Sequence, residues 1–251
     1  MEIKNIEFAY GRQKVLNDIS FKLRDGKITT VIGANGCGKS TLFNIMTKNL
    51  KPQRGKVLLN GEDIQNLSLK SFARQVAIVH QYNTAPCDLT VEKLVSYGRI
   101  AHGGFNRNYE EDQKYIKFAM DITGVCEFSK KQISALSGGQ KQRVWIAVAL
   151  AQNTKILLLD EPTTYLDIRY QIEILRLIKK LNTEYKMTVV MVLHDINQSI
   201  AYSDYILAMK EGKILSEGAP DEVINEKLIK EVYGIELKVE NTEKGKFVMT
   251  I

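Results

Sequence analysis

The sequence has no long apolar run: nowhere in its 251 residues do about eighteen apolar residues follow one another. A helix that crosses a bilayer needs about 20 predominantly apolar residues, so we expect no segment to span a membrane. Residues 1–8 alternate polar and apolar side chains and lack the apolar core of a signal peptide. We therefore expect a soluble chain that stays in the cytoplasm.

Cysteine is scarce as well. The three cysteines, Cys37, Cys87 and Cys126, have no metal-binding spacing, and an odd number cannot all pair in disulfides. Free thiols in a reducing compartment are the expected state.

Long runs of basic residues are also missing, although the net charge is +6. The basic residues come in pairs such as Lys130-Lys131 and Lys179-Lys180, and acidic residues lie among them. Attraction to anionic lipid requires clusters of about four to eight basic residues. We interpret the charge as a solvated surface and expect no nucleic-acid partner. The chain contains no internal repeat and no low-complexity segment.

What the sequence does contain is a phosphate-binding loop. Residues 33–41 read GANGCGKST and fit the pattern G-x-x-x-x-G-K-[ST]. The β-branched apolar run 28–32 before it predicts a buried parallel strand, and the spacing of residues 41–46 after it predicts a helix. Glycines let backbone N–H groups surround a phosphate chain, and a helix N-terminus favours negative charge there.

This loop supplies the first set of expected ligands. Lys39 is expected to reach the β- and γ-phosphates, and the Ser40 hydroxyl to ligate Mg²⁺. The nucleotide-binding residues expected in the loop are Gly33, Asn35, Gly36, Cys37, Gly38, Lys39, Ser40 and Thr41. Because Cys37 lies near Lys39 and a helix N-terminus, we expect its pKa to be lowered and its modification to be faster when nucleotide is absent.

Two further segments add chemistry to the loop. The apolar strand 156–160 ends at Asp160, which is expected to be the second protein anchor for Mg²⁺, and Glu161 follows as a general base for the attacking water. Residues 136–140 read LSGGQ, and Ser137 is placed to cap the helix that follows. Backbone amides of Ser-Gly-Gly at a helix N-terminus make a second anion site.

The chain reads as an α/β protein. Residues 2–8 and 19–24 alternate as an antiparallel strand pair, whereas apolar residues from 88 to 134 fall at helical spacing. Strands return at 156–160 and 188–193 with a helix between them, which predicts parallel strands. The other predicted elements are strands 55–61 and 76–79, a glycine loop at 102–104, and a tail from 212 with a strand, helices 220–224 and 226–233, and a strand pair ending at 247–251.

Taken together, these ordered motifs resemble the ATP-binding cassette (ABC) family over essentially the whole chain. The resemblance implies a P-loop NTPase core with an N-terminal antiparallel β-subdomain and an inserted helical subdomain. We expect one such domain over 1–251, with the helical subdomain at about 88–150, signature segment included, and a C-terminal extension at about 212–251.

The resemblance also implies roles for single residues. Tyr10 would stack on adenine, and Gln81 would sense Mg²⁺ and the γ-phosphate. His194 would contact the γ-phosphate and hold the water with Glu161. Ser137, Gly138, Gly139 and Gln140 would bind the ATP of the opposite subunit, and Asp167 would contact that subunit.

In this family each ATP lies between the phosphate loop of one subunit and the signature segment of the other. The chain has one of each and is therefore expected to form a head-to-tail homodimer that ATP closes and hydrolysis opens. With no membrane span of its own, it would act on separate permease subunits at the cytoplasmic face of the membrane, through residues 82–98. The full system would include an extracytoplasmic substrate-binding protein.

The segments 97–99, 162–171 and 217–220 are similar to those of importers for iron–siderophore complexes, haem and cobalamin, although Ala101 and Tyr170 depart from that pattern. An exporter subunit and an ABC ATPase acting on nucleic acid or the ribosome are the alternatives. A GTPase or a small-molecule kinase is a weaker interpretation of the phosphate loop. Residues 121–124 read DITG and match the D-x-x-G pattern of GTPases, but no N-K-x-D for guanine follows. Neither class gives residues 136–140 a role.

Overall fold

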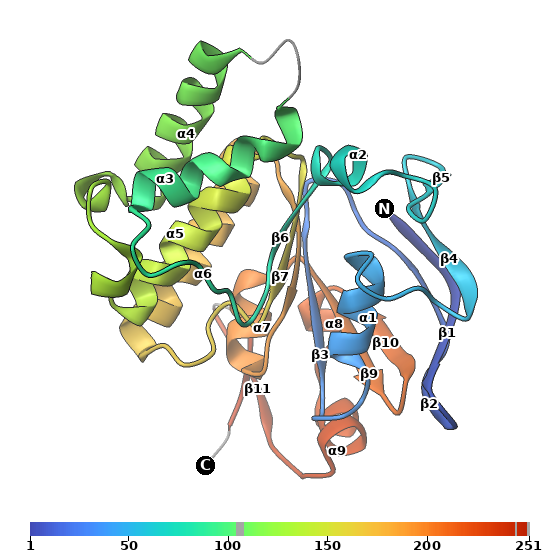
Figure 1. Ribbon diagram of the computed structural model, residues 1–251. Coiled ribbons are helices and arrows are strands. Elements are labelled where there is room, and N and C mark those ends of the chain that lie inside the picture. Colours follow the sequence, from blue (N-terminus) through green and yellow to red (C-terminus); the bar gives the residue numbers. More distant parts are fainter. Residues whose placement is uncertain (104–107, 244, 250–251) are drawn as a thin grey trace. The chain divides into compact units, whose positions relative to one another are not determined.

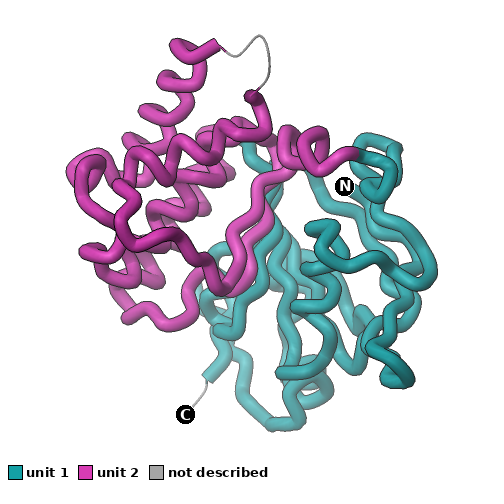
Figure 2. The backbone as a smooth tube through the Cα atoms, in the orientation of Figure 1, with its two compact units in different colours: residues 1–67, 186–251 teal, residues 68–185 magenta. Residues whose placement is uncertain are grey.

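The computed structural model describes residues 1–103, 108–243 and 245–249. The chain divides into two compact units, which Figure 2 shows in separate colours. Unit 1 comprises residues 1–67 and 186–251, and unit 2 comprises residues 68–185.

Unit 1 contains an antiparallel sheet with the strand order β2-β1-β4-β5 (Figure 1). Its strands are β1 (Glu2–Tyr10), β2 (Gln13–Lys22), β4 (Arg54–Leu59) and β5 (Glu62–Asp63). Ile6 and Phe8 of β1 are buried and Glu7 between them is less so, which is the alternation that predicted this strand. Ile3 is also buried, but the register shifts between Ile3 and Ile6. The predicted antiparallel pair of 2–8 and 19–24 is confirmed, and both strands extend to the turn at Gly11.

A second group of strands in unit 1 carries the phosphate loop. Strand β3 (Ile28–Gly33) lies between β8 (Thr188–Val192) and β9 (Tyr205–Lys210), parallel to both, and β10 (Lys213–Gly218) runs antiparallel to β9. All six residues of β3 are buried, as the β-branched run predicted. Helix α1 (Lys39–Met46) follows the loop, and α7 (Ile196–Tyr202) follows β8.

Strand β9 was not predicted. Its run of apolar residues is short and does not alternate, so periodicity alone does not distinguish a buried strand from a helix. What identifies β9 as a strand is a tertiary contact that the sequence does not display: β9 pairs in parallel with β3, on the edge of β3 opposite to β8.

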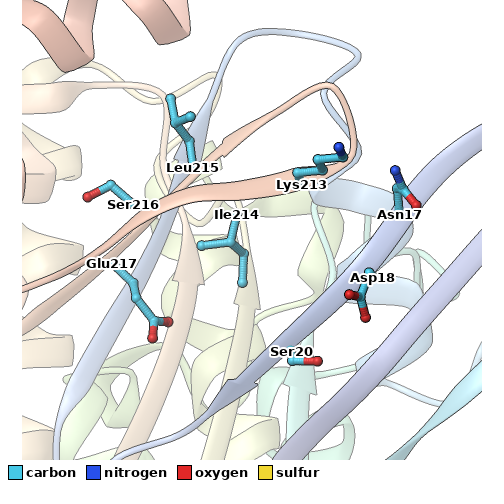
Figure 3. Close-up of a pocket in the computed structure, with 8 residues that line it drawn as sticks. All are labelled: Asn17, Asp18, Ser20, Lys213, Ile214, Leu215, Ser216 and Glu217. Atoms are coloured by element: carbon cyan, nitrogen blue, oxygen red, sulfur yellow. The ribbon is translucent and has the colours of Figure 1, made fainter.

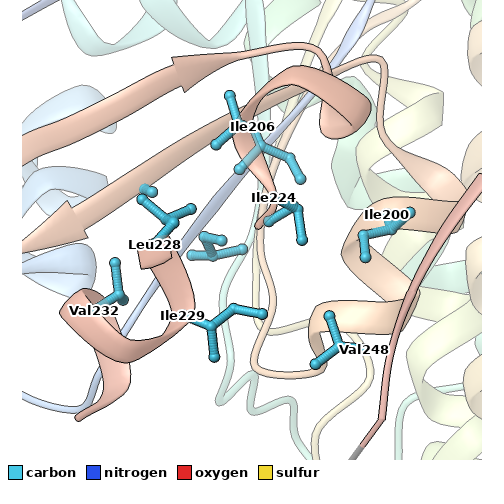
Figure 4. Close-up of a cluster of buried hydrophobic side chains, with 10 residues drawn as sticks. Ile200, Ile206, Ile224, Leu228, Ile229, Val232 and Val248 are labelled. Carbon is cyan, nitrogen blue, oxygen red and sulfur yellow. The ribbon is translucent and has the colours of Figure 1, made fainter. Parts of the chain in front are cut away.

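The C-terminal extension builds its own core against the same sheet. Helices α8 (Pro220–Val223) and α9 (Glu226–Tyr233) confirm the two predicted helices, and β11 (Val239–Thr242) pairs with β12 (Gly245–Val248). Residues 250–251 of the predicted last strand lie outside the described residues. Figure 4 shows the cluster, in which α8, α9 and β12 side chains pack with residues of β3, α7 and β9. Its members include Ile32, the residue before the phosphate loop.

Unit 2 is mainly helical. Its strands β6 (Val76–Val79) and β7 (Ile156–Asp160) are parallel, with Val79 opposite Leu159. Its helices are α2 (Leu69–Ala73), α3 (Val91–Ser96), η1 (Tyr97–His102), α4 (Tyr109–Thr123), η2 (Cys126–Phe128), η3 (Ile133–Ala135), α5 (Gly138–Ala151) and α6 (Ile168–Tyr185). Helix α5 is central and packs against α3, α4 and α6. Of the loop expected at 102–104, residue 104 lies outside the described residues.

A buried ion pair joins η1 to its neighbours in unit 2. The Arg99 guanidinium donates to Asp112 Oδ1 at 2.7 Å and to the carbonyl oxygen of Ala151 at 2.8 Å. Next to it, a Cβ on Gly98 would lie only 2.2 Å from the carbonyl oxygen of Val148, so η1 approaches α5 more closely than any other residue would allow. The segment 97–99, which resembles one group of importers, therefore has a packing role.

Across the described part of the chain, no helix is both long enough and apolar enough to pass through a bilayer.

Candidate functional site

The phosphate loop of unit 1 connects the end of β3 to the start of α1. Three of its glycines, Gly33, Gly36 and Gly38, have positive φ angles of 155°, 79° and 108°. A Cβ on Gly33 would lie 2.5 Å from the carbonyl oxygen of Met209, so both backbone conformation and space require glycine there. The loop thus has the backbone shape that turns successive N–H groups toward one concave face.

Lys39 is held inside this loop. Its side chain is 5% exposed, and its ammonium group donates to the carbonyl oxygens of Gly33 at 2.7 Å and Ala34 at 3.1 Å. The charge of Lys39 is therefore fixed at the loop and does not extend into solvent. Asn35, Gly36 and Ser40 are exposed, whereas Thr41 is buried in the first turn of α1.

The expectation for Cys37 was wrong. Burial raises the pKa of the Cys37 thiol, and the opposing effect of the nearby Lys39 charge is smaller. The side chain is 6% exposed, so loss of hydration disfavours the thiolate more than the lysine favours it. Proximity to a cation was visible in the sequence, whereas the depth of the thiol was not.

Two other predicted residues of unit 1 are exposed. Tyr10, at the end of β1, is 52% exposed, and its ring meets that of Phe8 edge-to-face with centroids 4.9 Å apart. About half of the Tyr10 side chain is therefore accessible to a planar ligand. His194 follows the end of β8 and precedes Asp195, whose side chain caps α7 by accepting from the N–H of Gln198 at 2.8 Å. The strand end thus places His194 at the surface.

In unit 2 the acidic strand end lies beside Gln81. Strands β6 and β7 pair in register up to Val79 and Leu159, so two residues further along each chain Gln81 comes next to Glu161. The Gln81 amide nitrogen donates to Glu161 Oε2 at 2.6 Å, and the Thr164 hydroxyl donates to the same oxygen at 3.0 Å. Glu161 has a φ of 48°, a left-handed conformation uncommon outside glycine.

The segment 136–140 of unit 2 forms a capping box at the start of α5. The Ser137 side chain accepts from the N–H of Gln140 at 3.4 Å, and the Gln140 side chain accepts from the N–H of Ser137 at 3.0 Å. The predicted cap is confirmed. Ser137 and Gly138 are exposed at this helix N-terminus.

Asp167 starts helix α6. Its Oδ1 accepts from the N–H of Tyr170 at 2.9 Å, which satisfies one of the unpaired donors of the first turn. The residue is exposed.

Reasoning from sequence missed some of the site. Thr164, whose hydroxyl donates to Glu161, was not singled out, because no pattern in the sequence marks a bond between these two side chains. Tyr82 was noted only within a segment for partner contact, and Tyr165 only within a motif. The structure joins their hydroxyl groups at 2.8 Å.

A pocket of about 700 Å³ in unit 1 lies elsewhere on the chain. Figure 3 shows its lining from β2 and β10, including Asp18, Lys213 and Glu217. None of its lining residues is one of the predicted site residues, and charges of both signs face it. It has no feature of a phosphate site.

Ser40, Gln81 and Asp160 are the predicted metal residues whose side-chain oxygens suit Mg²⁺, since this ion prefers oxygen ligands. Among the described residues no group of three or more His, Cys, Asp or Glu is arranged to hold a metal. Mg²⁺ in nucleotide sites is usually held by one or two protein oxygens plus substrate phosphates. The donor set fits that mode and does not provide a metal cage made of protein alone.

Comparison with known proteins identifies the family. Residues 16–164, more than half of the chain, match the model of the ABC transporter family. The chain belongs to this family. Its match begins before the phosphate loop of unit 1 and ends after the acidic pair of unit 2, so it includes both motifs.

Individual relatives agree with the family. The chain is 45% identical over 240 residues to the iron(3+)-hydroxamate import ATP-binding protein FhuC of Bacillus subtilis (strain 168), which covers 95% of this chain and 89% of that protein. Among solved structures it resembles a metal-chelate type ABC transporter in an inward-facing conformation, with a TM-score of 0.83, 27% identity, and coverage of 98% of this chain and 94% of that one.

A third relative bears on the reaction. The ATP-binding cassette MJ0796, solved as a dimer in a post-hydrolysis state with ADP and Pi, superimposes with a TM-score of 0.76 and 30% identity over 87% of this chain and 98% of its own. The fold is thus that of an ABC ATPase, as the motifs predicted, and the chain is an ATP-hydrolysing subunit of this family.

Proposed function

We propose that this ATPase powers a membrane importer for a ferric siderophore or a related metal chelate such as haem or cobalamin. The observation that carries the proposal is the 45% identity, over 95% of the chain, to an ATP-binding protein named for iron(3+)-hydroxamate import. The likeness to a metal-chelate type transporter supports the same substrate class.

ATP would bind first to unit 1. The amides of the loop 33–41 would surround the phosphates, Lys39 would neutralise the β- and γ-phosphates, and the exposed ring of Tyr10 would stack on adenine. Because the Lys39 ammonium already sits at the loop carbonyls, binding would require only a short shift of its side chain.

Mg²⁺ would be held by the hydroxyl of Ser40, the side chain of Gln81 and the carboxylate of Asp160, together with the phosphates. When bound, the ion neutralises charge that develops on the β- and γ-phosphate oxygens. The burial of the apolar residues of β7 fixes the position from which Asp160 is presented.

Glu161 would take the proton of the attacking water as general base, and His194 would contact the γ-phosphate and orient that water. The hydrogen bonds from Gln81 and Thr164 to Glu161 hold the carboxylate in one orientation. Positioning and electrostatics supply most of the catalysis in phosphoryl transfer, so a fixed base is what the reaction requires.

The site would be completed by a second copy of the chain. The exposed N-terminus of α5, with Ser137, Gly138, Gly139 and Gln140, would bind the γ-phosphate of the ATP held by the other subunit, and Asp167 would contact that subunit. The dimer solved for MJ0796 supports this arrangement. ATP would close the head-to-tail homodimer, and hydrolysis would open it.

The remaining partners are those of an importer. Residues 82–98 would contact permease subunits, placing the ATPase at the cytoplasmic face of the membrane, and an extracytoplasmic protein would deliver the chelate. In domain terms the chain would be one ABC ATPase domain over 1–251, with a helical subdomain at about 88–150 and a C-terminal extension at about 212–251.

The experiment that tests this proposal uses a strain lacking the gene and supplied with a ferric hydroxamate as its sole iron source. The wild-type gene should restore growth and uptake of the labelled chelate. The Glu161→Gln variant should not, because it lacks the base, yet the purified variant should bind ATP and form a stable dimer.

Glu184→Gln provides the matched control. Glu184 is an exposed residue of α6 with a 4.0 Å ion pair to Lys180, so its loss should leave uptake unchanged. If Glu161→Gln hydrolysed ATP at the normal rate, Glu161 would not be the general base. Normal uptake of the chelate by the deletion strain would remove the substrate class and direct attention to an exporter or a ribosome-associated ATPase.

A further inference from the structure

Two exposed tyrosines of unit 2 make a contact that the proposed mechanism does not use. Tyr82 is 69% exposed and Tyr165 is 79% exposed, yet their hydroxyl groups lie 2.8 Å apart and their ring centroids 6.1 Å apart. Exposed tyrosine hydroxyls are ordinarily satisfied by water. A direct bond between two of them therefore points to segments that already run side by side.

These segments are the continuations of β6 and β7. Tyr82 is the residue after Gln81, and Tyr165 lies four residues after Glu161. The bond from Gln81 to Glu161 and the bond between the tyrosines thus join the same two segments at two successive points.

The segment after β7 needs such restraint. Glu161 and Tyr165 have positive φ angles of 48° and 63°, and both are non-glycine residues. Left-handed conformations of this kind persist only where surrounding contacts enforce them. Within the turn, the N–H of Thr164 donates to the carbonyl oxygen of Glu161 at 3.2 Å, and its hydroxyl donates to the Glu161 carboxylate. Tyr82 supplies the contact at the far end of the turn.

We propose that Tyr82 and Tyr165 are a positioning pair that keeps Glu161 in its hydrogen-bonded contact with Gln81. This inference rests on the proposed roles of those two residues in hydrolysis. Neither tyrosine touches a reacting atom; the pair acts by fixing the turn that carries the base. The pair acts on the turn that carries the base, and neither its bond nor the bond from Gln81 to Glu161 involves a residue of the loop 33–41. Loss of the pair should therefore lower turnover and leave ATP affinity unchanged.

The test compares Tyr82→Phe, Tyr165→Phe and the double variant, each of which keeps the ring and removes a hydroxyl group. Each single variant should lower kcat about three- to tenfold, the range expected for one neutral hydrogen bond, with the KM for ATP unchanged within about twofold. The double variant should lose no more than the single ones, because either substitution already breaks the bond.

Tyr109→Phe is the matched control, since Tyr109 is also 69% exposed and lies on α4. It should match the wild type in kcat and KM. ATP affinity, measured on every variant, checks that each remains folded. Three results would each contradict the proposed role of the tyrosine pair. The first is an unchanged kcat in either single variant, and the second is a reduction of kcat in the double variant equal to the product of the two single reductions. The third is a rise in the KM for ATP with no fall in kcat.

Glu161→Gln, assayed beside them, separates the two proposals. Turnover that survives Glu161→Gln overturns the base and the pair together. An inactive Glu161→Gln with fully active tyrosine variants overturns the pair alone and leaves the proposed function standing.

Discussion

Two adjacent glycines at the start of α5 have different neighbours. A Cβ on Gly138 would lie 3.6 Å from Leu166 Cδ2, an ordinary contact, whereas a Cβ on Gly139 would lie 2.3 Å from the ring of Tyr170. The chain itself therefore has room at Gly138 and none at Gly139. If Gly138 is nonetheless indispensable, the reason lies outside the single chain.

We therefore expect Gly138→Ala to fold with a Tm at or above that of the wild type, since alanine favours a helix by up to about 1 kcal/mol over glycine. Its ATPase activity should fall sharply, because under the proposed function the added methyl group would face the γ-phosphate of the ATP held by the other subunit. Gly139→Ala should lower the Tm as well as the activity. Thermal denaturation and ATPase assays distinguish the two, and full activity of Gly138→Ala would contradict the shared site.

The cysteines should differ in their reaction with a thiolate-selective reagent. The pKa of Cys126 is raised to about 11, first by burial and then by its hydrogen bond to Asp121, and burial raises that of Cys37. A raised pKa leaves little thiolate at neutral pH, so both should alkylate slowly there and faster as the pH increases. Cys126 and Cys87 are both exposed, and Cys87 serves as the reference. At pH 7 Cys87 should therefore be alkylated faster than Cys37 and Cys126. Mass spectrometry of samples labelled at pH 7 and pH 9 measures the three rates, and fast labelling of Cys37 at pH 7 would contradict the prediction.

At the scale of elements, the buried pair of Arg99 and Asp112 fastens η1 to α4. Removing one partner leaves the other charge buried, which typically costs about 3–5 kcal/mol. Arg99→Ala should therefore lower the free energy of unfolding by about that amount. Urea denaturation measures the loss, and Lys130→Ala is the control. The Lys130–Glu92 pair is 82% and 41% exposed, so its loss should cost less than about 1 kcal/mol. If Arg99→Ala and Lys130→Ala lowered the free energy of unfolding equally, the burial of the Arg99–Asp112 pair would add nothing to stability.

Elements with a strong local signal were predictable and the others were not. Strand β3 and helix α1 follow from a β-branched run, glycines and helical spacing within about twenty residues. Strand β9 and the short helix α7 have no such signal, because their form depends on packing against elements distant in sequence. The same applies to Arg99: its segment was visible as a resemblance, but its burial depends on α4 and α5 folding around it.

At the scale of the whole molecule, sharing of sites predicts complementation. Lys39→Ala should abolish nucleotide binding by its own loop, and Ser137→Arg should block the site of the partner. An equal mixture should recover activity at about a quarter of the sites, since half of the dimers are mixed and each holds one intact site.

Ser137→Ala is the control for this experiment, because it removes the helix cap at a cost of about 1 kcal/mol without adding bulk. A mixture that contains mixed dimers but remains inactive would argue against sharing. If Ser137→Ala chains on their own were as inactive as Ser137→Arg chains, loss of the cap, and not a blocked interface, would explain the inactivity of Ser137→Arg.

The motifs of the site were readable from sequence because phosphate binding demands particular residues at fixed spacing. The contacts between motifs were not readable. The bond from Gln81 to Glu161 arises from the register of β6 and β7, which lie about eighty positions apart in sequence. The substrate is invisible for a different reason: in an importer it contacts the permease and the binding protein, and not the ATPase.

The packing of β12 has a practical meaning for anyone who clones this gene. Val248 is fully buried, and its N–H and carbonyl group bond the side chain of Asn197 at 2.8 Å and 3.0 Å, in the same core that includes Ile32. An expression clone stopped at codon 243 would therefore uncover apolar surface beneath the strand that leads into the phosphate loop. A purification tag fused near Val248 needs a spacer long enough to leave that strand undisturbed.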